Sequence, residues 1–208
     1  MLRMLIAGVL VVFACVNSAE AAGDDRSARG IVERLQNGIF EVLKHAKELG
    51  VDGRYELILP VLERDAHIPL MTATASGPYW REGSKTQKER AIKAFAEMHS
   101  ALLAALFDSY NGETYKTVKV RETGGKIVLV DSNIIDSDGE PTLVTFATAK
   151  IKGRWWVIDV IIAGGISEVK VKRNEFNRLL EEGGLDNLSA ALERKKDRLL
   201  FGEEKAVR

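Results

Sequence analysis

Residues 115–162, YKTVKVRETGGKIVLVDSNIIDSDGEPTLVTFATAKIKGRWWVIDVII, decide the fold of this chain. Apolar and polar residues alternate along most of this stretch, which is the pattern of β-strands. Short turns rich in glycine and aspartate interrupt the alternation, and turns of this length join neighbouring antiparallel strands. The sequence therefore predicts a four-stranded antiparallel meander, which Gly164-Gly165 is expected to end. The predicted strands are Tyr115–Glu122, Lys126–Ile135, Thr142–Ile151 and Arg154–Ile162.

Helices are predicted on both sides of this segment, because apolar residues recur there at intervals of three and four. A first helix is expected over 27–48, ending at Gly50, and a long helix follows Ser84 and stops at Asn111-Gly112. The fold class is then α+β, with a curved four-stranded antiparallel sheet wrapped by N- and C-terminal helices into a cone. Such a cone is either filled by side chains or holds an apolar ligand. Shorter helices are expected over 55–62, 68–74, 171–182 and 185–198, the last two separated by Gly183-Gly184.

The first 22 residues have the layout of a secretory signal peptide. Leu5 to Val16 form a short apolar core, and Ala19-Glu20-Ala21 is a cleavage site of the A-x-A type. A lipoprotein signal with Cys15 as the lipidated residue is one alternative. An uncleaved anchor is the other, although the apolar run is shorter than the roughly 20 residues that span a bilayer. We therefore expect a signal peptide over 1–22, whose cleavage removes the only cysteine, and a single periplasmic domain over 23–208.

Charge is balanced along the chain, with 30 Lys and Arg residues, 30 Asp and Glu residues and a formal net charge of zero. Binding along the phosphates of a nucleic acid requires a basic surplus, so nucleic acid is not expected as a partner. Standing adsorption to an anionic membrane is not favoured either, although a local basic patch is compatible with this composition.

Few side chains suggest catalysis or metal binding. His45, His67 and His99 each lie alone in a helical segment, with no second metal ligand at i+4. Asp65 and His67 form a D-x-H motif, which is interpreted most simply as a solvated or helix-capping pair. Asp159, the one acidic residue in an apolar strand, either binds backbone amides or a basic residue at the sheet edge, or acts as a general acid or base. No glycine-rich phosphate loop is recognisable, and neither a cofactor nor a metal is expected.

Apolar residues are in surplus on the fourth strand and on the long helix. Alternation places Trp155, Val157, Asp159 and Ile161 on one face of the strand, and Trp156, Ile158, Val160 and Ile162 on the other. Helices are therefore expected to cover the outer face, while the inner face lines a core or a ligand. A plain core explains each residue by itself, whereas together they favour an apolar ligand. The long helix carries an apolar stripe that is wider than packing against a single core requires. It is formed by Phe95, Met98, Leu102, Leu103, Leu106 and Phe107.

Three sequence blocks occur in order within about residues 27–196. They are Tyr79-Trp80 followed by Thr86-Gln87-Lys88-Glu89-Arg90 and Phe95; Gly153 to Val160; and Gly165-Ile166-Ser167 followed by Arg173, Phe176 and Gly183-Gly184. They resemble the W…T…Q-R…F, G-x-W-x-V-x-D-V and G-V-S…R…F…G patterns of the MlaC family of periplasmic phospholipid-binding proteins. The chain is most similar to the hopanoid-associated branch of that family, called HpnM.

The resemblance implies a carrier without a catalytic group. Such a carrier shields acyl chains of a phospholipid or a hopanoid between sheet and helices. It shuttles them between the outer membrane and an inner-membrane ABC transporter, and so serves outer-membrane lipid asymmetry. The implied transient partners are that transporter complex and an outer-membrane lipoprotein complex.

Two other functions are compatible with the residues. One is an enzyme on a hydrophobic substrate that uses Asp159 or the Asp65 and His67 pair, and the other is an assembly factor with a filled core. Alternation and helical spacing select the following residues for a lipid site: Tyr79, Phe95, Met98, Leu102, Leu103, Leu106, Phe107, Val128, Val130, Val144, Phe146, Trp155, Val157, Val160 and Ile162.

Overall fold

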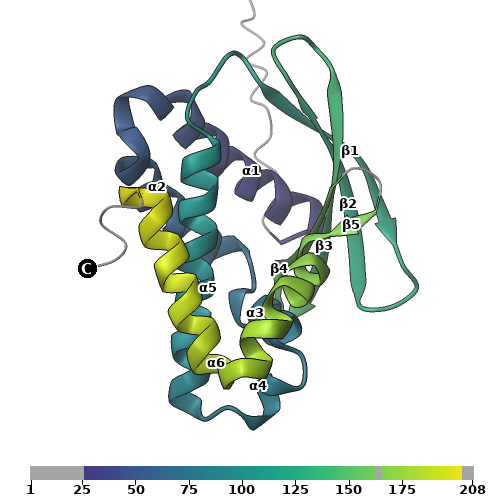
Figure 1. Cartoon of the computed structure of the whole chain (residues 1–208). Coiled ribbons are helices and arrows are strands. Elements are labelled where there is room, and N and C mark those ends of the chain that lie inside the picture. The colour runs from purple at the N-terminus through teal and green to yellow at the C-terminus, as the bar shows by residue number, and fades with distance from the viewer. Residues whose placement is uncertain (1–25, 163–164, 203–208) are drawn as a thin grey trace, which may run out of the picture.

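The computed structural model describes residues 26–162 and 165–202, and the predicted signal peptide over 1–22 lies outside these residues. Helices precede and follow the sheet, as the sequence predicts (Figure 1). The helices are α1 (Ala28–Lys44), α2 (Ala46–Asp65), α3 (Ile68–Ser76), α4 (Tyr79–Glu82), α5 (Lys85–Leu106) and α6 (Glu168–Phe201). The strands are β1 (Thr114–Glu122), β2 (Ile127–Ile135), β3 (Pro141–Ile151), β4 (Arg154–Ile162) and β5 (Ile166–Ser167).

The sheet is antiparallel throughout, and its strands follow the chain order β1-β2-β3-β4-β5. The predicted meander is confirmed, but the prediction of four strands is wrong. After Gly165 the chain adds β5, in which Ile166 pairs with Ile162 and Ser167 pairs with Ile161. The sheet therefore continues beyond the glycine pair that was expected to end it. A strand of two residues is too short to show an alternation in the sequence.

The first helix boundary also differs from the prediction. α1 ends at Lys44 and α2 begins at Ala46, so Gly50 lies inside α2 and does not cap α1. Gly50 has a φ of +62° and marks a kink in α2. Glycine adopts this left-handed conformation readily because it has no Cβ. A glycine after a helical pattern predicts a break in the helix, and here the chain resumes helical geometry directly after the break.

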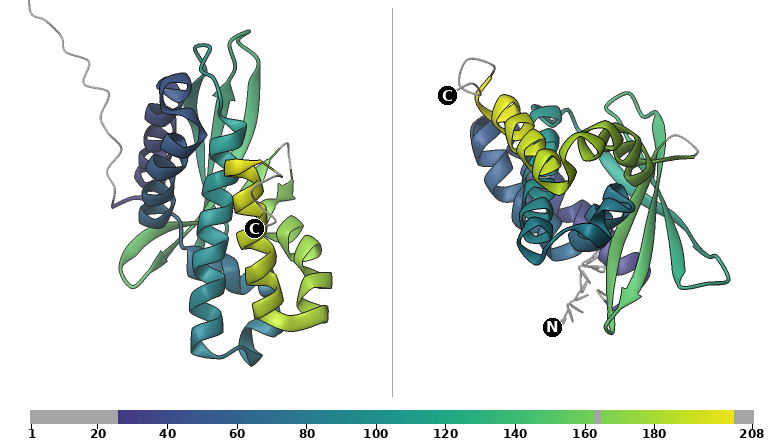
Figure 2. Two further views of the ribbon diagram at one scale, coloured as in Figure 1. Left: turned by 60° about the vertical axis from the view of Figure 1, so that its left-hand side comes forward. Right: turned by 60° about the horizontal axis from the view of Figure 1, so that its bottom comes forward.

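The start of α5 and the bend in α6 agree with the sequence. Ser84 and Gln87 form a capping box: Ser84 Oγ accepts from the Gln87 backbone N–H at 3.2 Å, and Gln87 Oε1 accepts from the Ser84 N–H at 2.8 Å. The two predicted closing helices are the halves of α6, which is kinked at Gly183 and Gly184. The halves fold back on each other as a V, visible in both views of Figure 2.

The buried apolar residues form two clusters. The first, here called the helical core, joins α3, α5 and α6 around Phe95 and Phe176. The second, here called the sheet core, joins α1 and α2 to one face of the sheet around Ile31, Ile58 and Val130. α5 packs against both α2 and α6 and contributes to both cores. Among the helices of the described residues, none is long and apolar enough to span a membrane.

Candidate functional site

The face of the sheet that meets α1 and α2, here called the inner face, is apolar. Val130, Phe146 and Val157 are buried at its centre. Side chains that are only partly buried surround them and pack against the same cluster: Val128, Val144, Trp155 and Val160. Apart from Ile162, the sheet residues selected from the sequence for lipid binding therefore lie within one apolar surface. Their role in binding stays a prediction.

A bulge in β4 changes the faces that strict alternation assigns to this strand. The register between β3 and β4 skips Ile158, so the alternation shifts by one residue there. Val160 consequently packs in the sheet core with Trp155 and Val157, although alternation had placed it on the opposite face. The predicted division of β4 into two faces is thus wrong beyond Ile158, because a bulge leaves no mark in the apolar pattern.

The inner face continues outward to an uncovered edge of the sheet. Val144 of β3 pairs with Ile162 of β4, and Ile162 pairs with Ile166 of β5. Directly paired residues point to the same face. Val144 is partly buried, whereas the exposed fraction reaches 37% at Ile162 and 56% at Ile166. This row, here called the apolar row, therefore leads from the sheet core to solvent.

Two polar atoms without partners lie at the other end of the same row. Ser132 of β2 pairs with both Val144 and Thr117 of β1, and its Oγ accepts from Gln36 Nε2 of α1 at 2.9 Å. Within the described part of the chain, Gln36 Oε1 and Thr117 Oγ1 are buried and have no hydrogen-bond partner. Such atoms are uncommon because each costs about 1–3 kcal/mol. The sequence carries one signal for this pair, a glutamine in the apolar stripe of α1, four residues after Val32.

The selected helical residues are divided between the two cores. Phe95 and Met98 are buried in the helical core, and Tyr79 packs against it, whereas Leu103 packs against the sheet core. Helical spacing places residues on one stripe, but a long helix meets different neighbours along its length. The structure therefore does not bring these residues together into one surface. The remaining three lie near the C-terminal end of α5, with Leu102 and Phe107 partly buried and Leu106 64% exposed.

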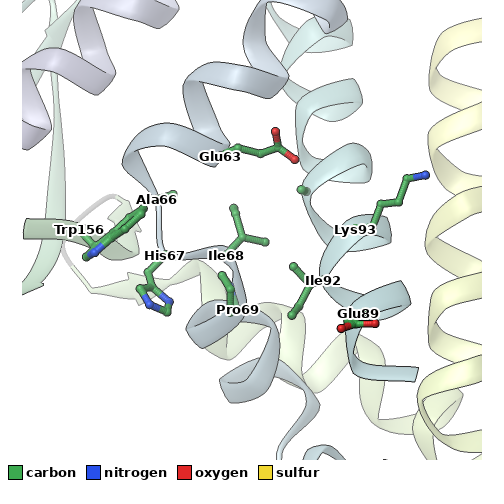
Figure 3. A pocket seen from close by; sticks show the side chains of 10 residues that line it. Glu63, Ala66, His67, Ile68, Pro69, Glu89, Ile92, Lys93 and Trp156 are labelled. Atoms are coloured by element: carbon green, nitrogen blue, oxygen red, sulfur yellow. The ribbon is translucent and has the colours of Figure 1, made fainter. Parts of the chain in front are cut away.

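A separate cleft of about 530 Å³ lies between the α2–α3 turn and α5 (Figure 3). Ile68, Pro69 and Ile92 provide an apolar lining, and Trp156 stands at one side. Arg154 lies over the Trp156 ring, 4.1 Å from its centroid. The lining of this cleft includes none of the residues selected for lipid binding.

The D-x-H motif at this cleft does not form an acid–histidine pair. The Asp65 carboxylate is fully buried and accepts from Arg34 Nε at 2.9 Å and from Arg64 Nη2 at 2.7 Å. His67 Nδ1 instead accepts from the Leu70 backbone N–H at 3.1 Å and caps α3. The capping interpretation is confirmed for His67, whereas Asp65 is neither solvated nor a cap but a buried carboxylate paired with arginines that are partly exposed.

Asp159 of β4 forms hydrogen bonds to β5 and to the start of α6. Oδ1 accepts from the backbone N–H groups of Val160 at 2.8 Å and Val169 at 3.1 Å, and Oδ2 accepts from Ser167 Oγ at 2.6 Å. Ser167 in turn caps α6 by accepting from the Lys170 N–H. The interpretation that Asp159 binds backbone amides is confirmed, so its position is explained by a structural role. No group of three or more His, Cys, Asp or Glu residues suited to a metal ion occurs among the described residues.

Residues 33–194 match the family described as MlaC protein. This chain belongs to the MlaC family. The family resemblance seen in the three sequence blocks is thus confirmed, whereas assignment to the HpnM branch stays a prediction.

A solved structure has a fold similar to that of this MlaC-family chain. It is a phospholipid-binding protein from Ralstonia solanacearum in complex with a phospholipid. The TM-score is 0.73 at 18% sequence identity, and the match covers 83% of this chain and 98% of that chain. At this identity the likeness establishes the fold alone, and it confirms an α+β architecture with an antiparallel sheet.

Proposed function

We propose that this MlaC-family protein is a periplasmic carrier that holds the acyl chains of a phospholipid against the inner face of its sheet. The observation that carries the proposal is the apolar row from Val144 through Ile162 to Ile166, which joins the sheet core to solvent. Family membership supports it, as does the phospholipid in the R. solanacearum relative.

The physical need for such a carrier follows from the cost of exposing an acyl chain. Each CH₂ group in water costs about 0.8 kcal/mol, so a 16-carbon chain costs on the order of 12 kcal/mol. Unassisted passage through an aqueous compartment is then negligible. A carrier has to cover the chain nearly as well as a bilayer does, yet not so tightly that release fails. This task requires an apolar surface with access to solvent and no catalytic group.

The direction and partners of transport are part of the same proposal. The signal-peptide pattern of residues 1–22 supports export, and the family supports exchange between an outer-membrane lipoprotein complex and an inner-membrane ABC transporter. A hopanoid is the alternative cargo, in keeping with the similarity of the sequence blocks to the HpnM branch.

The first test is native and denaturing mass spectrometry of the protein secreted to the periplasm and purified without detergent. We expect one bound lipid per chain, and its mass identifies the cargo as phospholipid or hopanoid. A protein that carries no lipid, and that also extracts none from phospholipid vesicles, would overturn the proposal.

A second test locates the site. Val160→Trp adds a large ring to the partly buried inner face beside Phe146, its partner on β3. We expect at least a tenfold loss of lipid loading in this variant, with Leu57→Trp on the exposed surface of α2 as the matched control. Circular dichroism checks that both variants fold. Full loading of a folded Val160→Trp protein would exclude the inner face as the lipid site.

A further inference from the structure

The second half of α6 carries charged residues on two sides, and those facing α5 are paired. Arg90 Nη2 of α5 lies 2.7 Å from Glu193 Oε2 of α6. Lys196 Nζ of α6 lies 3.4 Å from Glu97 Oε2 of α5. The groove between these helices is therefore electrically balanced by its own side chains.

The charged residues on the other side of this second half, which faces the first half of α6, are not paired in the same way. Arg194, Lys195 and Arg198 line a cavity of about 310 Å³ between the two halves of the helix, here called the α6 cavity. Among the described residues, none of these three forms an ion pair, although their neighbours on the opposite side all do. The only acidic residue in the lining is Glu175, and its Oε2 is already 2.8 Å from Lys172 Nζ. The α6 cavity is therefore positive.

This arrangement works against the stability of the isolated helix. Arg194 and Arg198 are four residues apart on α6, and like charges at that spacing repel each other. An alternating arrangement, as on the side facing α5, would remove the repulsion. Cations gathered around a concave site without counter-charges are typical of an anion-binding site.

The floor of the α6 cavity is apolar. It is formed by Phe176, Leu179 and Leu192, of which Phe176 and Leu192 are buried in the helical core. The volume is at the lower end of the range for small-molecule sites, and the site is concave. A ligand that matches the apolar floor and the three cations around it has one anionic group and a short apolar part.

The positive field extends beneath the floor. The Phe176 ring meets Phe95 edge-on, with ring centroids 6.3 Å apart, and Phe95 lies against His99, with centroids 4.0 Å apart. The pKa of His99 is lowered to about 4, chiefly by burial; the charges of Lys172 and Lys195 lower it further, while the charge of Glu175 acts in the opposite direction. The His99 ring is thus a built-in reporter of an anion bound at the cavity.

We propose that the α6 cavity binds the phosphate group of an anionic amphiphile, with Arg194, Lys195 and Arg198 on the phosphate and the apolar part of the ligand on Phe176. Guanidinium groups bind both carboxylate and phosphate in a bidentate manner, but three cations around one site match the charge of about −1.5 to −2 on a phosphate monoester better than the single charge of a carboxylate. The site belongs to the helical core and not to the inner face of the sheet, so it is independent of the acyl-chain site proposed above.

The test follows the His99 ring by NMR in the full-length mature protein. Inorganic phosphate and dihexanoyl phosphatidic acid, below its micelle concentration, are titrated separately. We expect both to raise the His99 pKa towards its ordinary value, with phosphatidic acid binding at least about fivefold more tightly and both weakening in high salt. Equal affinities would reject the amphiphile in favour of free phosphate. No response of His99 to either compound would overturn the site.

Charge removal provides the matched control. Replacing Arg194 and Lys195 by Gln should weaken phosphatidic acid binding at least about tenfold, because two charge-assisted contacts are lost. Replacing Lys170 and Arg178 by Gln removes the same charge from exposed positions in the first half of α6 and should leave binding unchanged. An equal loss in both double variants would contradict the site. Lipid loading of the inner face, measured by mass spectrometry, should be unaffected in both.

Discussion

At the scale of single residues, His99 shows how its surroundings set the properties of a side chain. From the sequence it is one of three isolated histidines. In the structure its Nδ1 lies 2.8 Å from the Phe95 carbonyl oxygen, and burial is the main reason that its pKa is lowered to about 4. The ring is therefore neutral at neutral pH and donates to that carbonyl.

This shift predicts acid sensitivity. Between its unfolded pKa of about 6.5 and the folded value, the unfolded chain binds a proton that the folded protein does not accept, so stability falls as the pH is lowered through this window. The loss between pH 7 and pH 4 is about 3 kcal/mol. His99→Gln keeps a donor for the Phe95 carbonyl and should flatten this part of the profile, whereas the surface variant His45→Gln should not. The free energy of urea unfolding, measured from pH 7 to pH 4, checks this; identical slopes in wild type and His99→Gln would contradict it.

At the scale of secondary-structure elements, one side chain holds three elements together. Asp159 on β4 binds the hydroxyl of Ser167 in β5 and the Val169 amide in the first turn of α6. A carboxylate near a helix N-terminus is also favoured by the helix dipole. The sheet edge and the last helix are therefore stabilised at the same point.

Asp159→Asn tests this role. The substitution keeps the shape but removes the charge and one acceptor, so we expect a loss of about 1–3 kcal/mol in the free energy of unfolding. Asp138→Asn, in the exposed turn between β2 and β3, is the control and should have no measurable effect. Chemical denaturation measures both variants. A folded Asp159→Asn protein of unchanged stability would show that these hydrogen bonds contribute nothing.

Of the two glycines at the kink of α6, Gly184 is the one whose backbone lies in the left-handed region. Gly184 has a φ of +60° and open space where a Cβ would be, so Gly184→Ala strains the backbone without a steric clash. We expect a cost of roughly 1–3 kcal/mol and a Tm several degrees lower. A Cβ at position 125 would also have few neighbours, but the backbone of Gly125 is not in the left-handed region. The Tm of Gly125→Ala should therefore stay close to that of the wild type. A similar Tm in both variants would show that the kink does not require glycine.

At the scale of the whole molecule, two cores share one long helix. The helical core is closed by α3, α5 and α6, whereas the inner face beside the sheet core remains open at the β5 edge. A lipid that covers this edge binds the folded protein and not the unfolded chain, and it therefore stabilises the fold by mass action.

Removal of the lipid should then lower the Tm of the wild-type protein. At a free ligand concentration of 100 times Kd, the stabilisation is about 2.7 kcal/mol. Adding phospholipid back should restore the Tm of the wild type but not that of Val160→Trp, and differential scanning calorimetry measures both. A delipidated wild-type protein with the same Tm as the loaded protein would argue against a ligand on the inner face.

The sequence by itself determined the local features of this protein. The alternation and turns of residues 115–162 predicted the meander, Ser84 predicted the start of α5, and Gly183-Gly184 predicted the break in α6. Periodicity, capping and left-handed glycine depend on residues within a few positions of one another. The three ordered sequence blocks also indicated the MlaC family.

Only the tertiary structure decided which surfaces these elements form. The bulge at Ile158 places Val160 on the inner face, and β5 pairs with the edge of β4 at Ile161 and Ile162. The division of α5 between two cores and the cations of the α6 cavity arise from packing between distant segments. Such contacts depend on how the elements lie against one another in space, and neither period nor spacing along the chain specifies that.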